Sequence, residues 1–134
     1  MPACRVNAPS SALHVRTNAA DPAAATRLSK LIRARRARDR YLGRSLFSDP
    51  AWDILLEAYV AHLAGRPVSV TALCDAAAVP TTTGLRWLRK LEEDELLVRE
   101  ADARDKRRSW MRLSAAAAEA MKNYFLAVDG TFPI

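Results

Sequence analysis

The most constraining feature of this sequence is a break between two short helical segments near the middle of the chain. Ser69 is a favoured helix N-cap, and the residues after it place Leu73 and Cys74 on one apolar face. Val79-Pro80-Thr81 interrupts this pattern after about two and a half helical turns, because proline cannot continue a helix interior. A second helix is expected over residues 82–94, so the sequence predicts two helices joined by a turn of three to four residues.

The segments on either side predict the rest of the domain. The expected elements are a helix from Pro50 with Asp49 as N-cap, a short extended piece at Val68, the two helices above, β-rich runs at 96–100 and 109–113, and a last helix at 115–128 capped by Ser114. Helix, strand, helix, turn, helix and two-stranded hairpin is the order of a winged helix-turn-helix. The predicted fold class is therefore mainly α with a small β-hairpin wing, occupying residues 49–134.

The second helix of the pair has two chemically different faces. Gly84, Trp87, Leu88 and Leu91 fall on one face, which is expected to pack on the core, with Gly84 leaving room for the Trp87 indole. The opposite face carries hydroxyl and charged side chains, namely Thr82, Arg86, Arg89, Lys90 and Glu93. Arginine can bind O6 and N7 of guanine through two hydrogen bonds, and hydroxyls near a helix start hold phosphate. This face therefore suits the major groove of DNA.

Positive charge is concentrated in the first third of the 134-residue chain. The formal net charge is +6, and residues 1–49 hold ten Lys or Arg against three Asp or Glu, whereas residues 50–134 hold eleven against twelve. Residues 1–22 lack a sustained apolar period and are expected to form a disordered arm. The charge distribution makes an anionic partner the first expectation.

A basic helix is expected over residues 23–42. Its apolar stripe consists of Leu28, Leu31, Ile32 and Leu42. Arg35 and Asp39 lie on that stripe at i, i+4 spacing, so a partly buried pair between them is expected. The run at 33–40 is interpreted either as a solvated basic face or as a face that contacts phosphate or a protein partner. We expect residues 23–48 to act as a dimerisation element together with the last helix.

Residues 50–125 resemble the MarR-like branch of winged helix-turn-helix transcriptional regulators. The segments that carry the resemblance are 68–73, 83–93, 96–99, 102–108 and 110–114. Glu95 stands where the family usually has a glycine after its recognition helix. The resemblance implies that Asp105 orients a wing arginine and that Arg107 enters the minor groove, whose A·T-rich stretches attract guanidinium groups. A solvated charged turn is the alternative interpretation of this loop.

The leading hypothesis is a sequence-specific DNA-binding transcriptional regulator of bacterial type that is cytoplasmic, homodimeric and bound to double-stranded DNA. The residues expected at the DNA are Thr81, Thr82, Leu85, Arg86, Arg89 and Lys90 of the recognition helix and Arg104, Asp105, Lys106, Arg107 and Arg108 of the wing. The alternative hypothesis is a winged-helix module that binds a protein or RNA through its basic N-terminal helix. Salt-dependent binding to duplex DNA distinguishes the two hypotheses.

Other chemistries lack the residues that they need. Two cysteines, Cys4 and Cys74, cannot staple a chain of this size, and His14 and His62 do not have zinc-ligand spacing. The sequence has neither a Gly-rich phosphate loop nor a nucleophile–base arrangement, so we expect no enzyme, metal or cofactor. No apolar run reaches the roughly 18 residues of a membrane span. Cys74 is interpreted as small core filling, with a redox sensor as the weaker alternative, and nothing identifies a small-molecule effector.

Overall fold

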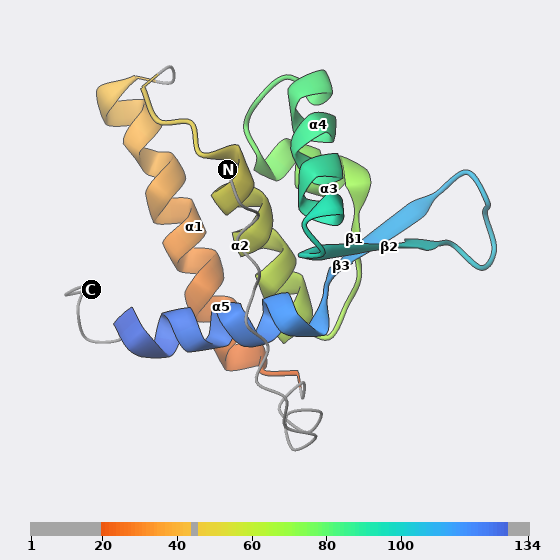
Figure 1. Ribbon diagram of the computed structural model, residues 1–134. Coiled ribbons are helices and arrows are strands. Elements are labelled where there is room, and N and C mark those ends of the chain that lie inside the picture. Colours follow the sequence, from red (N-terminus) through yellow and green to blue (C-terminus); the bar gives the residue numbers. More distant parts are fainter. Residues whose placement is uncertain (1–19, 44–45, 129–134) are drawn as a thin grey trace.

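The computed structural model describes residues 20–43 and 46–128 (Figure 1). Its elements, in chain order, are α1 (Pro22–Leu42), α2 (Pro50–Leu63), β1 (Val68–Ser69), α3 (Val70–Ala76), α4 (Thr81–Glu93), β2 (Leu97–Ala101), β3 (Ser109–Leu113) and α5 (Ala115–Val128). The predicted fold class, mainly α with a β-hairpin wing, is confirmed. No helix among the described residues is long and apolar enough to cross a membrane.

Helix α1 begins earlier than predicted. Most of the expected arm lies outside the described residues, but Pro22 is the first residue of α1 and Asp21 is its N-cap. The Asp21 carboxylate accepts a hydrogen bond from the Ala24 N–H at 3.0 Å. The Asp21 N–H donates to the Leu63 carbonyl at the end of α2 at 2.6 Å. The last residues assigned to the arm therefore belong to the folded domain, because they cap the first turn of α1.

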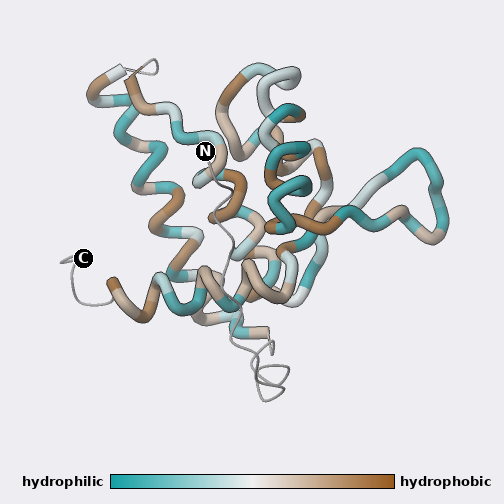
Figure 2. The backbone as a smooth tube through the Cα atoms, in the orientation of Figure 1, coloured by the Kyte–Doolittle hydropathy of each residue, from teal (hydrophilic) through white to brown (hydrophobic). Residues whose placement is uncertain are grey.

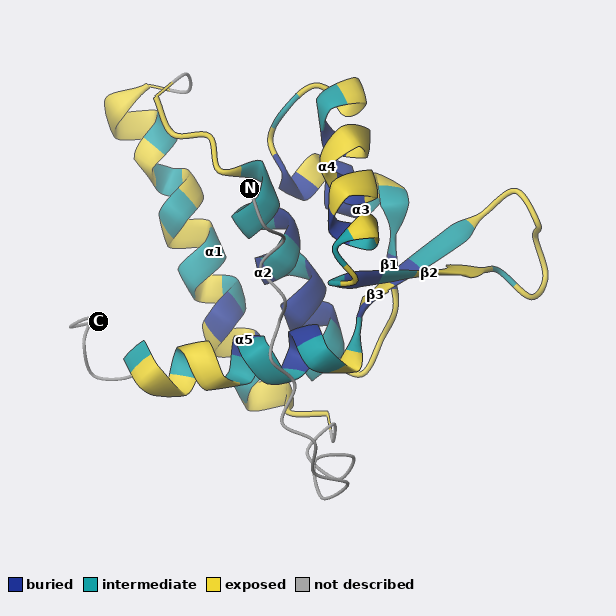
Figure 3. Cartoon of the chain, viewed as in Figure 1, coloured by how far each residue is buried: buried dark blue, intermediate teal, exposed yellow. Residues whose placement is uncertain are grey.

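Helix α2 is the central element, and it packs against α1, α3, α4, β3 and α5. Ile54 and Leu56 of α2 are fully buried, together with Leu73 of α3, Leu88 of α4 and Met111 of β3. Figure 3 shows this buried layer along α2 and the helices that face it. Full burial of one such side chain stabilises a fold by about 1.5 to 3 kcal/mol. Apolar packing thus holds the helix-turn-helix and the sheet together as one body.

Strands β1, β3 and β2 form an antiparallel sheet with β3 in the centre. Val68 pairs with Met111 and Leu97 with Leu113, and all four side chains are buried. Strand β3 has the predicted bounds, whereas β2 begins one residue later than expected. Beyond these paired residues the hairpin projects away from the helices (Figure 1), and its tip is hydrophilic (Figure 2). The buried end of the hairpin therefore fixes the wing to the core and leaves its tip in solvent.

Helices α3 and α4 approach closely at Gly84, and this contact corrects the prediction for Trp87. A Cβ at Gly84 would lie 3.3 Å from Sγ of Cys74. The missing side chain therefore makes room for α3 and not for the indole, and Trp87 is 37% exposed at the edge of the buried face. Cys74 is buried, as its interpretation as core filling requires, and burial raises the pKa of its thiol.

Two residues that are not glycine adopt left-handed backbone conformations at the ends of these helices. Ala78 has a φ of 53° in the turn between α3 and α4, so α3 ends before it. Glu95 has a φ of 60° directly after α4. Glu95 thus takes the backbone conformation that favours glycine, the residue that usually stands at this position in the family that the chain resembles.

Helix α1 lies along α2, and its predicted apolar stripe is buried only in part. Leu28 is buried, and Leu31 and Ile32 are partly buried against the core. Leu42, at the end of α1, is 60% exposed. The apolar side of α1 is therefore largely used within the protomer.

The predicted pair between Arg35 and Asp39 is wrong. Arg35 pairs instead with Asp53 of α2, with 3.2 Å between Nη2 and Oδ1. Because α2 lies directly beside α1, it offers a tertiary partner that spacing along one helix cannot indicate.

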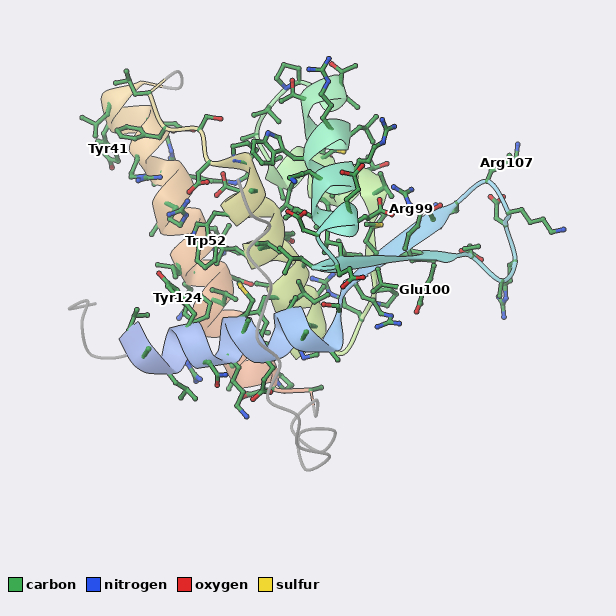
Figure 4. The ribbon with its side chains drawn as sticks, viewed as in Figure 1. Tyr41, Trp52, Arg99, Glu100, Arg107 and Tyr124 are labelled. Carbon is green, nitrogen blue, oxygen red and sulfur yellow. The ribbon has the colours of Figure 1, made fainter. Side chains whose placement is uncertain are left out.

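Helix α5 has the predicted bounds and begins with the predicted cap. The Ser114 hydroxyl oxygen accepts a hydrogen bond from the Ala117 N–H at 3.1 Å. Towards the other end of α5, Phe125 stacks against Tyr59 of α2, with ring centroids 5.8 Å apart. Tyr124 contacts Trp52 edge-on at 5.2 Å and remains 44% exposed (Figure 4). An aromatic cluster thus joins α2 to α5 and continues to the surface.

Candidate nucleic-acid interface

Helix α4 presents the predicted recognition residues to solvent. The predicted set on this helix, Thr81, Thr82, Leu85, Arg86, Arg89 and Lys90, is exposed throughout. The opposite face is anchored because Gly84, Leu88 and Leu91 are buried. Within the described residues, Arg86 and Arg89 have no hydrogen-bond or ion-pair partner, whereas Lys90 pairs with Asp94 at 3.2 Å. Two guanidinium groups are therefore available to a ligand on a rigid helix.

The wing tip is organised by Asp102, a residue that was not among the predicted site residues. Its Oδ1 accepts hydrogen bonds from the N–H groups of Arg104 at 2.7 Å and Asp105 at 3.2 Å. Its Oδ2 accepts from Nε1 of Trp110 at 2.8 Å. These donors, with the Arg104 N–H contributing most, hold the pKa of the Asp102 carboxyl below its usual value. The carboxylate therefore shapes the loop in its charged form.

Asp105 contacts Arg107, as the resemblance implies. Asp105 Oδ1 accepts a hydrogen bond from the Arg107 backbone N–H at 3.0 Å and lies 3.5 Å from its Nε. The Arg107 side chain is 94% exposed at the tip of the wing (Figure 4). Arg108 lies over the Trp110 ring, with 5.4 Å between Cζ and the ring centroid. Backbone hydrogen bonding thus fixes the loop, and the charged end of Arg107 extends into solvent.

This geometry agrees with a comparison against known protein families. Residues 57–117 match the family model described as the winged helix DNA-binding domain. This part of the chain has the winged helix fold. No curated protein matches the sequence.

Solved structures share the fold of this winged helix domain. AF1382 from Archaeoglobus fulgidus superposes with a TM-score of 0.54 at 20% identity, over 72% of this chain and 99% of its own. The MepR–DNA complex of S. aureus gives a TM-score of 0.51 at 21% identity, over 79% of this chain and 85% of its own. A mutant of E. coli MarR in complex with operator DNA gives a TM-score of 0.51 at 18% identity, over 77% of this chain and 72% of its own. The predicted resemblance to MarR-like regulators is thus confirmed at the level of the fold.

A two-point ion pair ties the wing of the winged helix domain to α4. Arg99 of β2 donates to Glu92 of α4 from Nη2 to Oε1 at 2.8 Å and from Nε to Oε2 at 3.3 Å. The hydrogen bonds to Glu92 raise the pKa of Arg99. Across the hairpin, Arg112 pairs with Glu100 at 2.6 Å. Charge-assisted hydrogen bonds therefore couple β2 to α4.

The structure brings the predicted residues together in two groups, on α4 and on the wing tip. The residues that sequence reasoning missed are those that shape the groups, chiefly Asp102, Trp110, Glu92 and Arg99. Asp102 had a sequence signal, because aspartate at the start of a loop often bonds to backbone N–H groups two or three residues later. The ion pair between Arg99 and Glu92 had no sequence signal, because it depends on the direction that β2 takes after the end of α4.

Proposed function

We propose that this chain is a sequence-specific transcriptional regulator that places α4 in the major groove of DNA and its wing in the minor groove. The observation that carries the proposal is a pair of exposed arginines on α4, Arg86 and Arg89, that have no hydrogen-bond or ion-pair partner among the described residues and lie beside a cationic wing tip. Proteins of the same fold, MepR and MarR, have been crystallised with DNA. A DNA partner in a bacterial-type regulator implies a cytoplasmic location.

Each group has a chemical match on the duplex. An arginine that projects from α4 can donate two hydrogen bonds to guanine, and the hydroxyls of Thr81 and Thr82 at the start of the helix can donate to phosphate. The wing is narrow, and Arg107 stands almost free of the protein surface, which suits the negative potential of a narrow A·T-rich minor groove. The recognition helix would supply base preference, and the wing would supply preference for flanking sequence.

We also propose that the chain acts as a homodimer that reads two half-sites about one helical turn apart. Large apolar side chains are exposed near the end of α1 and on α5, which supports these helices as the contact between protomers. The residues concerned are Tyr41, Leu42, Tyr124 and Leu126. Light scattering of the full chain tests this proposal, because a homodimer has twice the mass of one protomer.

The decisive experiment measures affinity for a selected operator and for random duplex over a salt series. Arg86→Ala and Arg89→Ala should each weaken operator binding by roughly 1 to 3 kcal/mol and reduce the preference for operator over random DNA. Arg27→Ala, which removes the same charge from the exposed side of α1, is the matched control. If neither recognition-helix variant changes operator binding, the assignment of α4 is wrong.

The alternative function, binding of a protein or RNA through α1, is favoured by the exposed basic side chains of that helix. The same salt series distinguishes this alternative from the DNA-binding regulator. A linear fall of log K with log salt on duplex DNA supports the regulator, whereas no measurable binding to duplex supports the alternative.

A further inference from the structure

Several positively charged side chains of α1 make no hydrogen bond or ion pair with the described residues. Its cations are Arg27, Lys30, Arg33, Arg35, Arg36, Arg38 and Arg40, and its one acidic residue is Asp39. Arg35 pairs with Asp53, and Arg38 lies over the Phe47 ring at 4.8 Å. The four side chains without a hydrogen-bond or ion-pair partner among the described residues are Arg27, Lys30, Arg33 and Arg40, and all four are exposed.

Two of these four lie on a ridge that faces the helix-turn-helix. Arg33, Arg36 and Arg40 follow one another at i, i+3 and i+7, so they occupy one edge of α1 and are called the basic ridge here. The ridge lines a groove of about 870 Å³ whose opposite wall includes Asp75 of α3 and Ala78 of the α3–α4 turn.

The middle residue of the basic ridge fixes it in place. Arg36 Nη2 donates to the Asp75 carbonyl at 3.3 Å and also to the Ala76 carbonyl, the last groups of α3. The last carbonyls of a helix lack partners inside it, so the guanidinium caps α3 from outside, and at the Asp75 carbonyl it joins the Ala78 N–H, which donates at 3.2 Å. Arg33 and Arg40 are therefore held on either side of an anchored contact.

The ridge and the wing lie on opposite sides of the recognition helix. In Figure 1, α4 stands between α1 and the hairpin of β2 and β3. Ala78, in the wall of the groove, precedes the first residue of α4 by three positions. A duplex that receives α4 in its major groove, about 12 Å wide, has a phosphate strand on each side of the helix. In such a complex the wing would face one strand and the basic ridge the other.

We propose that Arg33 and Arg40 bind backbone phosphates of the duplex on the side of α4 that lies away from the wing. This inference rests on the DNA-binding function proposed above. The two arginines are seven positions apart, about 10 Å along the helix axis, which matches roughly three base pairs of one strand better than a single small anion. Asp39 and Asp75 also line the groove and would repel a small anion seated inside it, whereas a strand at the rim avoids them.

The test compares two double variants of the full chain that remove the same charge. Arg33→Ala with Arg40→Ala removes the free ends of the ridge, and Arg27→Ala with Lys30→Ala removes two cations that do not line the groove. Affinity for a random duplex of about 30 base pairs is measured by fluorescence anisotropy over a salt series. The slope of log K against log salt should fall by about 1.8 for the ridge variant, since each lost phosphate contact contributes about 0.9. The control variant should keep the wild-type slope, and Arg33→Lys with Arg40→Lys should restore most of it.

Each other outcome has a defined meaning. Equal slopes for the ridge and control variants would overturn the inference, because the effect would then be one of net charge alone. Calorimetry with inorganic phosphate at constant ionic strength tests whether the groove binds a free phosphate ion instead of the DNA backbone. Loss of phosphate binding in the ridge variant with an unchanged DNA slope would make the groove a small-anion site and also overturn the inference. If the wild-type chain binds no duplex, the proposed function itself fails, and that result is distinct from an unchanged slope.

Discussion

Asp102 sets the conformation of the wing through hydrogen bonds to two backbone N–H groups and one indole N–H. All three donors prefer the ionised carboxylate, which is why its pKa lies below the ordinary value of 3.8. The contribution of Asp102 to wing order is therefore complete above that ordinary value and is lost as the pH falls through the lowered value in the folded state.

Asp102→Asn should loosen the wing at neutral pH, because an amide NH₂ in place of Oδ2 cannot accept from Nε1 of Trp110. We expect the Trp110 indole N–H signal in NMR to shift and exchange faster, and DNA affinity to fall. The wild-type signal should change in the same direction only in strongly acid solution. Trp110→Phe, which removes the donor and keeps the carboxylate, separates the indole contact from the backbone contacts. A wild-type signal that changed between pH 5 and pH 7 would contradict the assignment to Asp102.

Backbone strain at Ala78 and Glu95 gives a second prediction at this scale. A left-handed conformation costs a residue with a Cβ roughly 1 to 2 kcal/mol, and glycine escapes that cost but loses more freedom on folding. Ala78→Gly and Glu95→Gly should therefore each raise the free energy of unfolding by up to about 1 kcal/mol in urea denaturation. The control is Ala120→Gly inside α5, which should lower it by a similar amount. Destabilisation at all three positions would show that the positive φ values carry no strain.

At the scale of elements, α1 is attached to the helix-turn-helix through Arg36. Arg36→Ala leaves the last carbonyls of α3 without their charged donor, so we expect the free energy of unfolding to fall by about 1 to 3 kcal/mol. Arg36→Lys should recover part of the loss, because an ammonium is a point charge and lacks the planar fork. Arg33 lies on the same ridge and has no hydrogen-bond or ion-pair partner in the part of the chain that the structure describes, so Arg33→Ala should leave stability unchanged in the same urea titration.

The elements themselves could be predicted from local signals, and their mutual contacts could not. Ser69 and Ser114 cap the helices that they were expected to cap, and proline marks the start of α2. The errors at Trp87 and Arg35 share one cause, because each residue's environment depends on a neighbouring helix that spacing along one helix does not locate. The same cause explains why the exposed residues of the candidate site were predictable while the Asp102 and Arg99 contacts that position them were not.

At the scale of the whole molecule, the charge on α1 bears on the proposed dimer. The apolar residues Leu31 and Ile32 already pack against the core, so replacing them by Asp should unfold the protomer instead of separating protomers. An interface built on the outer side of α1 must also bring two basic surfaces together in a symmetric pair.

Salt should therefore act in opposite directions on dimerisation and on DNA binding. Raising the ionic strength from about 0.05 M to about 0.3 M screens repulsion between the two copies of α1 and should tighten the dimer in sedimentation equilibrium. The same change should weaken duplex binding through counterion effects. A dimer that weakens with salt would place the contact elsewhere, away from α1.

The close approach of Gly84 to Cys74 has a practical consequence for watching this fold open. The thiol is shielded by α4 as well as by the core, so a thiol reagent can reach it only after α3 and α4 separate. In a Cys4→Ser background, the labelling rate of Cys74 therefore reports how often the two helices separate, without an added probe. Duplex DNA that holds both helices against the phosphate backbone should lower the labelling rate of Cys74.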